Sequence, residues 1–69
     1  MTTSQKIRMA LAYKRMSEAK LAKAVGSSPS AFNQRMGTDK FTTAELENIA
    51  AALGATYHFG FKFPDGTDI

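Results

Sequence analysis

Several kinds of residue are missing from this 69-residue chain, and each absence excludes a class of structure. There is no cysteine, so a disulfide framework and a thiolate metal site are excluded. No apolar run approaches the roughly 20 residues that a membrane-spanning helix needs. The first ten residues contain no signal-peptide hydrophobic region. We therefore expect one small cytoplasmic domain over residues 1–69, with no metal and no membrane partner.

The groups that usually carry catalysis are also scarce. His58 is the only histidine, and it stands among aromatic residues. No carboxylate pair converges by its spacing, and no glycine-rich phosphate loop follows a strand. We therefore expect no enzymatic activity and no cofactor.

Acidic residues are scarce in the first part of the chain. Residues 1–40 contain eight Lys/Arg and two acidic residues, whereas residues 41–69 contain one lysine and four acidic residues. The first part therefore carries a net charge of +6 and the second part −3. A positive field on one side of a protein favours phosphate binding. The alternative is that these lysines and arginines are simply solvated surface residues.

The stretch from residue 17 to residue 36 has the clearest local signals. Ser17 and Ser28 are typical helix N-caps, and Pro29 suits the first position of a helix. Gly26 lies between them and can take the left-handed backbone conformation that ends a helix. The stretch therefore predicts two short helices joined by a tight turn.

The apolar residues of this stretch agree with two crossing helices. Leu21, Ala22 and Val25 recur at helical spacing in the first helix, and Phe32 and Met36 do so in the second. A small residue before the turn and a large apolar residue after it allow two helices to cross closely. This pattern is typical of a helix-turn-helix.

Two further helices are predicted on either side, over residues 2–14 and 42–53. Thr2 with Gln5, and Thr42 with Glu45, have the spacing of a capping box. Residues 37–40 are predicted to form a polar turn. The predicted inward residues of the two helices are Ile7, Ala10, Leu11, Leu46, Ile49, Ala50 and Leu53.

Tyr13 lies near the end of the first predicted helix and admits two interpretations. It is a partly buried core residue in one, and its hydroxyl contacts a phosphate in the other. We favour the core interpretation.

The hydrophobic period changes to two after Gly54. The alternating aromatic residues predict a strand over residues 56–63, followed by a turn at Pro64–Gly66 and a very short return strand. The expected fold class is mainly α, with four helices followed by a C-terminal strand or short hairpin. Because an exposed aromatic strand invites pairing, we expect a homodimer in which this strand pairs with a second copy. The alternative is a strand that only closes the monomer core. The expected dimer-interface residues are Tyr57, Phe59, Phe61 and Phe63.

The sequence LAKAVGSSPSAFNQRM, with the following ELENIAAALG, resembles the Cro/phage-repressor-type helix-turn-helix domains of bacteria, phages and mobile elements. The resemblance covers about residues 7–54. It implies a lambda-repressor-like fold with motif helices at about residues 18–25 and 29–36, which lays the second of them in the major groove of DNA. Two residues depart from the family pattern: Ser27 is usually apolar there, and Arg35 stands where an apolar residue is common.

The residues that would contact DNA fall into two groups. Residues at the start of the second motif helix, and one turn later, read bases in the resembling repressors, and amide side chains can bond adenine in bidentate fashion. The predicted base-reading residues are Pro29, Ser30, Asn33 and Gln34. The predicted phosphate contacts are Lys14, Arg15, Lys20, Ser28, Arg35, Thr38 and Lys40.

We therefore expect a sequence-specific transcriptional regulator, most simply a repressor, that binds double-stranded DNA as a homodimer on a pseudo-palindromic operator. The alternative is a protein-binding module, such as an antitoxin or inhibitor, that captures a protein partner with its aromatic strand. The two functions can coexist in one protein.

Overall fold

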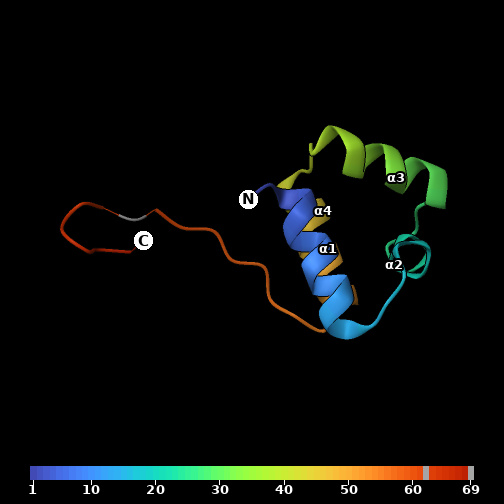
Figure 1. The fold of residues 1–69 in the computed structure, drawn as a ribbon, viewed down its shortest axis with the longest axis horizontal. Coiled ribbons are helices and arrows are strands. Elements are labelled where there is room, and N and C mark those ends of the chain that lie inside the picture. Colours follow the sequence, from blue (N-terminus) through green and yellow to red (C-terminus); the bar gives the residue numbers. More distant parts are fainter. Residues whose placement is uncertain (62, 69) are drawn as a thin grey trace.

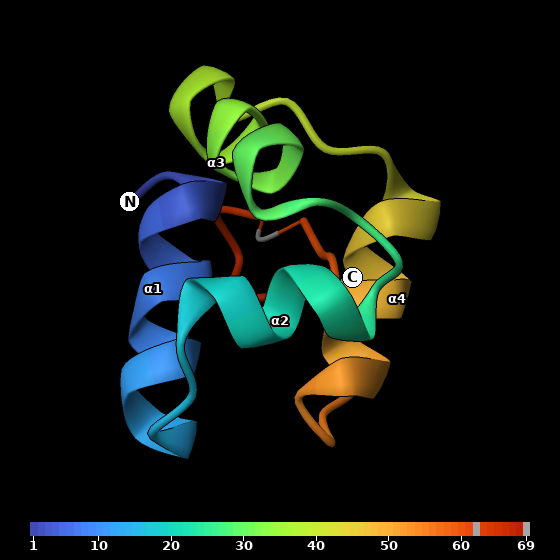
Figure 2. The ribbon, with the colours of Figure 1, turned by 90° about the vertical axis from the view of Figure 1, so that its right-hand side faces the viewer.

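The computed structural model describes residues 1–61 and 63–68, and it contains four α-helices in this part of the chain. They are α1 (Thr3–Lys14), α2 (Glu18–Ala24), α3 (Pro29–Thr38) and α4 (Thr43–Ala52). Figures 1 and 2 show α3 lying across one end of the helix group, and Figure 2 shows α2 crossing between α1 and α4. The prediction of a mainly α fold with four helices is confirmed. None of the helices described here is long and apolar enough to cross a bilayer.

The helices begin where the sequence predicts, because the expected side chains cap them. The hydroxyl groups at the caps of α1, α2, α3 and α4 each accept a bond from the backbone N–H three residues later. Gln5 and Glu45 complete the two predicted capping boxes. Gly26 has a φ of +75°, the left-handed conformation that ends α2 and turns the chain toward α3.

The end of α3 differs from the prediction. The helix continues through Gly37 and Thr38, which were expected in a polar turn, and it ends at Asp39. Asp39 takes the left-handed conformation with a φ of +58°, which aspartate tolerates better than most residues. In that position its carboxylate accepts the backbone N–H of Ser4 in α1, and this contact fixes where α3 ends.

The core lies where α2 meets the other helices. Leu21 and Ala22 are completely buried, and Phe32 and Met36 of α3 are almost so. The predicted close approach at Ala22 and the predicted anchors Phe32 and Met36 are therefore confirmed. The rest of the buried cluster comes from α1, from α4 and from the end of α4: Ile7, Leu11, Ile49 and Leu53.

Three residues predicted to point inward lie closer to the surface. Ala10 and Leu46 are only partly buried, although both pack against the core. Tyr13 is 87% exposed, so its interpretation as a core residue is wrong. Tyr13 is the second-last residue of α1, and it does not belong to the buried cluster.

Ser4 joins the start of α1 to the end of α3. Its side chain is buried, and its hydroxyl donates to the carbonyl of Met36 at 2.7 Å. Its backbone N–H donates to the Asp39 carboxylate at 2.6 Å. This bond from the Ser4 N–H lowers the pKa of Asp39. The two contacts hold α3 against the first turn of α1.

The lowered pKa of Asp39 predicts a pH-dependent contribution to stability. The ionised carboxylate is favoured in the folded state, so its contribution is present above the unfolded-state value of 3.8 and is lost as pH falls through the lower folded-state pKa. We expect Asp39→Asn to lower the melting temperature at pH 7, and this difference to disappear near pH 2. Circular dichroism melting of both proteins from pH 7 to pH 2 measures it. A melting difference that is the same at both pH values would contradict the contact.

The chain after α4 leaves the helices in an extended conformation (Figure 1). Among the described residues no β-strand forms within 56–61 or at 63, and Lys62 lies outside the described residues, as does residue 69 of the predicted return strand. The predicted turn is present, because Phe63 N–H bonds to the carbonyl of Thr67 at 2.7 Å. A strand needs a neighbour to accept and donate its backbone hydrogen bonds, and a single copy offers 56–61 none in the part described.

Candidate nucleic-acid interface

The predicted base-reading residues lie together on the outer face of α3. Phe32 and Met36 turn inward, so the residues between them face solvent. Ser30, Asn33 and Gln34 are three and four residues apart, which places them on one side of the helix. Pro29 occupies the first helical position, and all four residues are exposed. The structure thus brings the four predicted residues together on one accessible face.

Asn33 makes a contact that the sequence did not suggest. Its Nδ2 donates to the Oε1 of Glu18 at 3.2 Å. Glu18 is the first residue of α2 and is partly buried, whereas Asn33 is exposed in the middle of α3. The bond therefore ties the amide of a predicted base-reading residue to the neighbouring helix.

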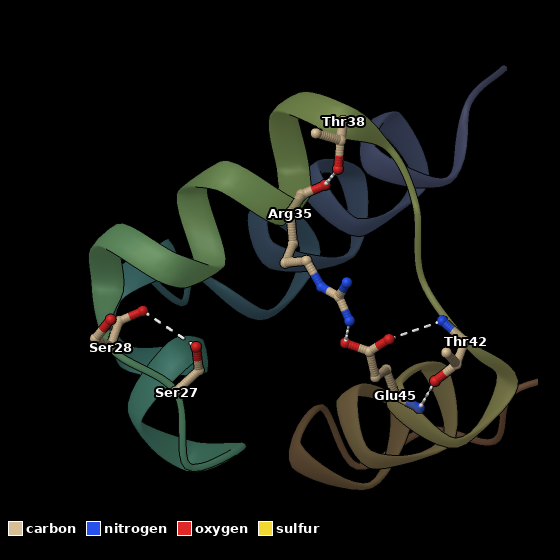
Figure 3. Close-up of polar contacts among 6 residues, drawn as sticks. All are labelled: Ser27, Ser28, Arg35, Thr38, Thr42 and Glu45. Carbon is tan, nitrogen blue, oxygen red and sulfur yellow. Dashed lines mark hydrogen bonds and ion pairs between the residues drawn. The ribbon is translucent and has the colours of Figure 1, made fainter.

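Arg35 lies on a different side of α3, toward α4 (Figure 3). Its guanidinium forms an ion pair with the carboxylate of Glu45. Glu45 also accepts the Thr42 backbone N–H of the capping box. The Thr42 N–H and the Arg35 guanidinium together lower the pKa of Glu45 to about 2. At neutral pH the pair is therefore fully charged, and the predicted phosphate contact Arg35 already has an anionic partner.

This ion pair predicts that Glu45 competes with DNA phosphates for Arg35. Replacing Glu45 with glutamine keeps the capping box, because glutamine serves the same position, but removes the charge. We expect Glu45→Gln to bind DNA a few-fold more tightly at low salt. The log–log salt slope should steepen by about 0.9, the value for one added phosphate contact. Fluorescence anisotropy with a labelled duplex measures both quantities.

Glu47→Gln is the matched control for this experiment. Glu47 lies on the same helix, is exposed, and its substitution removes one negative charge in the same way. Equal effects of the two substitutions on affinity and slope would show that only net charge matters, and that Glu45 does not hold Arg35 back.

The remaining predicted phosphate contacts are exposed but do not form one cluster with α3. Lys14 ends α1 and Arg15 is its C-cap. They lie at the end of α1 opposite the turn that touches α3, because ten residues of helix separate Ser4 from Lys14, roughly 15 Å. Figures 1 and 2 both show this end of α1 away from α3. Lys20 follows nearby in α2, in the turn that Ser17 caps.

The other three predicted phosphate contacts lie around α3. The Ser28 hydroxyl caps α3 by accepting the Ala31 N–H, and the Ser28 carbonyl accepts the Ser27 hydroxyl (Figure 3). The Thr38 hydroxyl donates to the carbonyl of Arg35 at 3.2 Å. Lys40 is exposed between α3 and α4. Ser28 and Lys40 thus lie at opposite ends of α3.

The predicted dimer-interface residues are mostly open to solvent. Phe59 is 69% exposed, Phe61 59% and Phe63 47%, and only Tyr57 is partly buried. The rings of Phe59 and Phe61 pack edge to face with centroids 4.9 Å apart. The segment from residue 55 onward, called the tail below, also borders a broad, mainly apolar hollow between α1 and α4. The structure therefore leaves three large aromatic side chains uncovered in one segment.

Some residues that shape this interface were missed from the sequence. Ser4 shares helical spacing with Ile7 and Leu11, three and seven residues later, and that spacing is a signal of its burial. The partners Glu18 and Glu45 lie 15 and 10 residues from Asn33 and Arg35, so only the packing of separate helices brings them together.

No protein-family model matches the chain, and neither a curated protein nor a solved structure matches it.

Proposed function

We propose that this chain is a sequence-specific DNA-binding transcriptional regulator of the lambda-repressor-like helix-turn-helix class. The observation that carries the proposal is the outer face of α3. Four residues able to contact base edges lie there side by side, above a core that fixes α3 against α2. An α-helix fits the major groove of B-form DNA, and polar side chains on its outer face reach the base edges. A regulator of this kind works on DNA in the cytoplasm.

The side chains on this face suit particular bases. Asn33 and Gln34 carry amides, which bond adenine through its N6 and N7 positions. Ser30 can donate to or accept from either kind of base edge, and Pro29 offers an apolar surface to a thymine methyl group. All four side chains are exposed, and the Asn33 amide keeps its Oδ1 acceptor and a second N–H beside its bond to Glu18.

Positive charge supports the proposal. Residues 1–40, which include α2 and α3, carry a net charge of +6, and five of the predicted phosphate contacts are lysines or arginines. Such contacts position a protein on DNA without reading sequence. Affinity for a duplex should fall steeply with salt, with a log–log slope of about −0.9 for each neutralised phosphate. A binding constant that does not change between low and moderate salt would contradict these contacts.

We also propose that the protein works as a homodimer joined by its C-terminal segment. In this arrangement residues 56–63 of two copies form an antiparallel pair, which supplies backbone partners to residues 56–61, for which the described part of one copy offers none. Each phenylalanine that becomes fully buried contributes roughly 1.5–3 kcal/mol. A dimer would present two α3 helices to major-groove half-sites about 34 Å apart on a pseudo-palindromic operator.

The dimer proposal predicts a mass that depends on the aromatic tail. We expect size-exclusion chromatography with light scattering to give twice the chain mass at tens of micromolar. Phe59→Ser combined with Phe61→Ser should give a monomer, since it removes the two most exposed aromatic rings of the tail. Met9→Ser is the control, because Met9 is 58% exposed on α1, outside the tail. A wild-type monomer at these concentrations would contradict the proposal.

The second candidate function is capture of a protein partner by strand addition. The exposed rings of Phe59, Phe61 and Phe63 favour it, because an extended aromatic segment can add to the sheet edge of another protein. Activity in cells separates the two functions. Loss of activity in Asn33→Ala and Gln34→Ala indicates DNA reading, whereas loss only in the tail variants indicates a protein partner. An antitoxin that represses its own promoter would need both surfaces.

A further inference from the structure

We propose that Glu18 is a positioning residue that sets the orientation of the Asn33 amide, so that Asn33 selects adenine over guanine. This inference rests on the proposed DNA-binding function and deepens it. Its basis is the bond between the Nδ2 of Asn33 and the Oε1 of Glu18, at 3.2 Å. Glu18 belongs to α2 and Asn33 to α3, so the bond joins the two helices of the motif.

The chemistry of the two groups fixes which way the amide lies. An ionised carboxylate only accepts hydrogen bonds, whereas an asparagine amide has two N–H donors at one end and a carbonyl acceptor at the other. Glu18 therefore attracts the Nδ2 end of the amide and repels the Oδ1 end. The carboxylate removes the ambiguity that a free amide on a helix surface would have.

This orientation leaves Asn33 with one N–H donor and the Oδ1 acceptor, which are the two groups that pair with adenine. In the proposed arrangement Glu18 accepts the N–H that points away from Oδ1, so that the second N–H stays beside the carbonyl as a donor–acceptor pair. Adenine presents an N7 acceptor and an N6 donor in the major groove, and this pair matches both. Guanine presents two acceptors, N7 and O6, so Oδ1 would face O6 and be repelled. A free amide can rotate to bring its N–H groups toward guanine, and Glu18 opposes that rotation.

A second role explains why Glu18 is tolerated on a basic surface. It is the first residue of α2, where a negative side chain interacts favourably with the helix dipole. This role accounts for an acidic residue at this position but not for its contact with α3. The contact of Glu18 with Asn33 is independent of its interaction with the dipole of α2. A test of the positioning role must therefore measure the orientation of the amide or base selection, and not stability.

The first measurement needs no DNA. In a ¹⁵N-labelled protein, Glu18→Ala should shift the side-chain N–H resonances of Asn33, and Glu47→Ala should leave them in place. Glu47 is a matched control because it is an exposed glutamate on α4 and its substitution changes net charge equally. Unchanged Asn33 amide resonances in Glu18→Ala would overturn the inference, whatever the protein does with DNA.

The second measurement is base selection on a duplex enriched by the wild-type protein. The base pair that Asn33 reads is the one where Asn33→Ala loses preference. A bidentate contact corresponds to about 5- to 150-fold discrimination. We expect Glu18→Ala to reduce the preference for adenine over guanine there at least about fivefold, while Glu47→Ala keeps it. Binding of both variants to an unrelated duplex should rise equally, since each loses one negative charge.

The outcomes separate this inference from the proposed function. If the wild type selects a sequence and Glu18→Ala retains the full adenine preference, the positioning role is wrong and the DNA-binding function stands. If the wild type selects no sequence at all, both are wrong. A combined loss in Glu18→Ala/Asn33→Ala no greater than in Asn33→Ala alone would confirm that Glu18 acts through Asn33.

Discussion

Replacing both Asn33 and Gln34 with alanine is expected to remove selection between DNA sequences while leaving binding to unrelated duplexes intact. The two amides lie on the outer face of α3, and neither belongs to the core. Each bidentate contact with a base corresponds to about 1–3 kcal/mol of discrimination. The double variant should therefore bind the selected duplex at least about 30-fold more weakly than the wild type does.

The salt dependence of this variant distinguishes lost base contacts from lost folding. Phosphate contacts remain in the variant, so its log–log salt slope should equal that of the wild type. Anisotropy titrations with the selected duplex and with a scrambled duplex measure both. Alanine is a good helix former, so α3 should persist in the circular dichroism spectrum. An equal loss on both duplexes would mean that α3 does not read bases.

The largest effect on stability is expected from Leu21→Ala. Leu21 is completely buried in α2, where the core cluster brings together side chains from all four helices. Truncating a buried leucine costs about 2–5 kcal/mol through lost transfer energy and the cavity that remains. Domains of this kind have only about 5–15 kcal/mol in total, and small ones lie at the low end. Much of the variant should therefore be unfolded at 37 °C.

Urea denaturation followed by circular dichroism measures this effect. Met9→Ala is the control, because it also truncates a long apolar side chain, but one that is 58% exposed. We expect its free energy of unfolding to change by about 0.5 kcal/mol or less. Similar losses in the two variants would contradict the central place of Leu21 in the core.

Much of the helical part could be predicted from the sequence because its determinants are local. The four N-caps act within three residues of themselves, and Gly26 ends α2 through its own backbone conformation. The inward face of α3 follows from the spacing of Phe32 and Met36. The burial of Ser4 was not predicted, because its side chain is polar, although its helical spacing from Ile7 and Leu11 indicates the inward face of α1.

The differences from the prediction have tertiary causes. The end of α3 depends on Asp39, whose carboxylate binds the Ser4 N–H of another helix. The partners of Arg35 and Asn33 come from α4 and α2, and no local pattern pairs residues across such distances. The alternating aromatics of residues 56–63 favour a strand, but a strand forms only beside a partner. That prediction stays open until a second copy or another protein is tested.

The most direct test of the account is selection from a random duplex library at two salt concentrations, with the bound duplexes sequenced. We expect enrichment of an inverted repeat whose half-sites are about one helical turn apart, together with weaker binding at the higher salt. Enrichment would supply the operator for every experiment above. Absence of binding at both salt concentrations would contradict the account and direct attention to a protein partner for the aromatic tail.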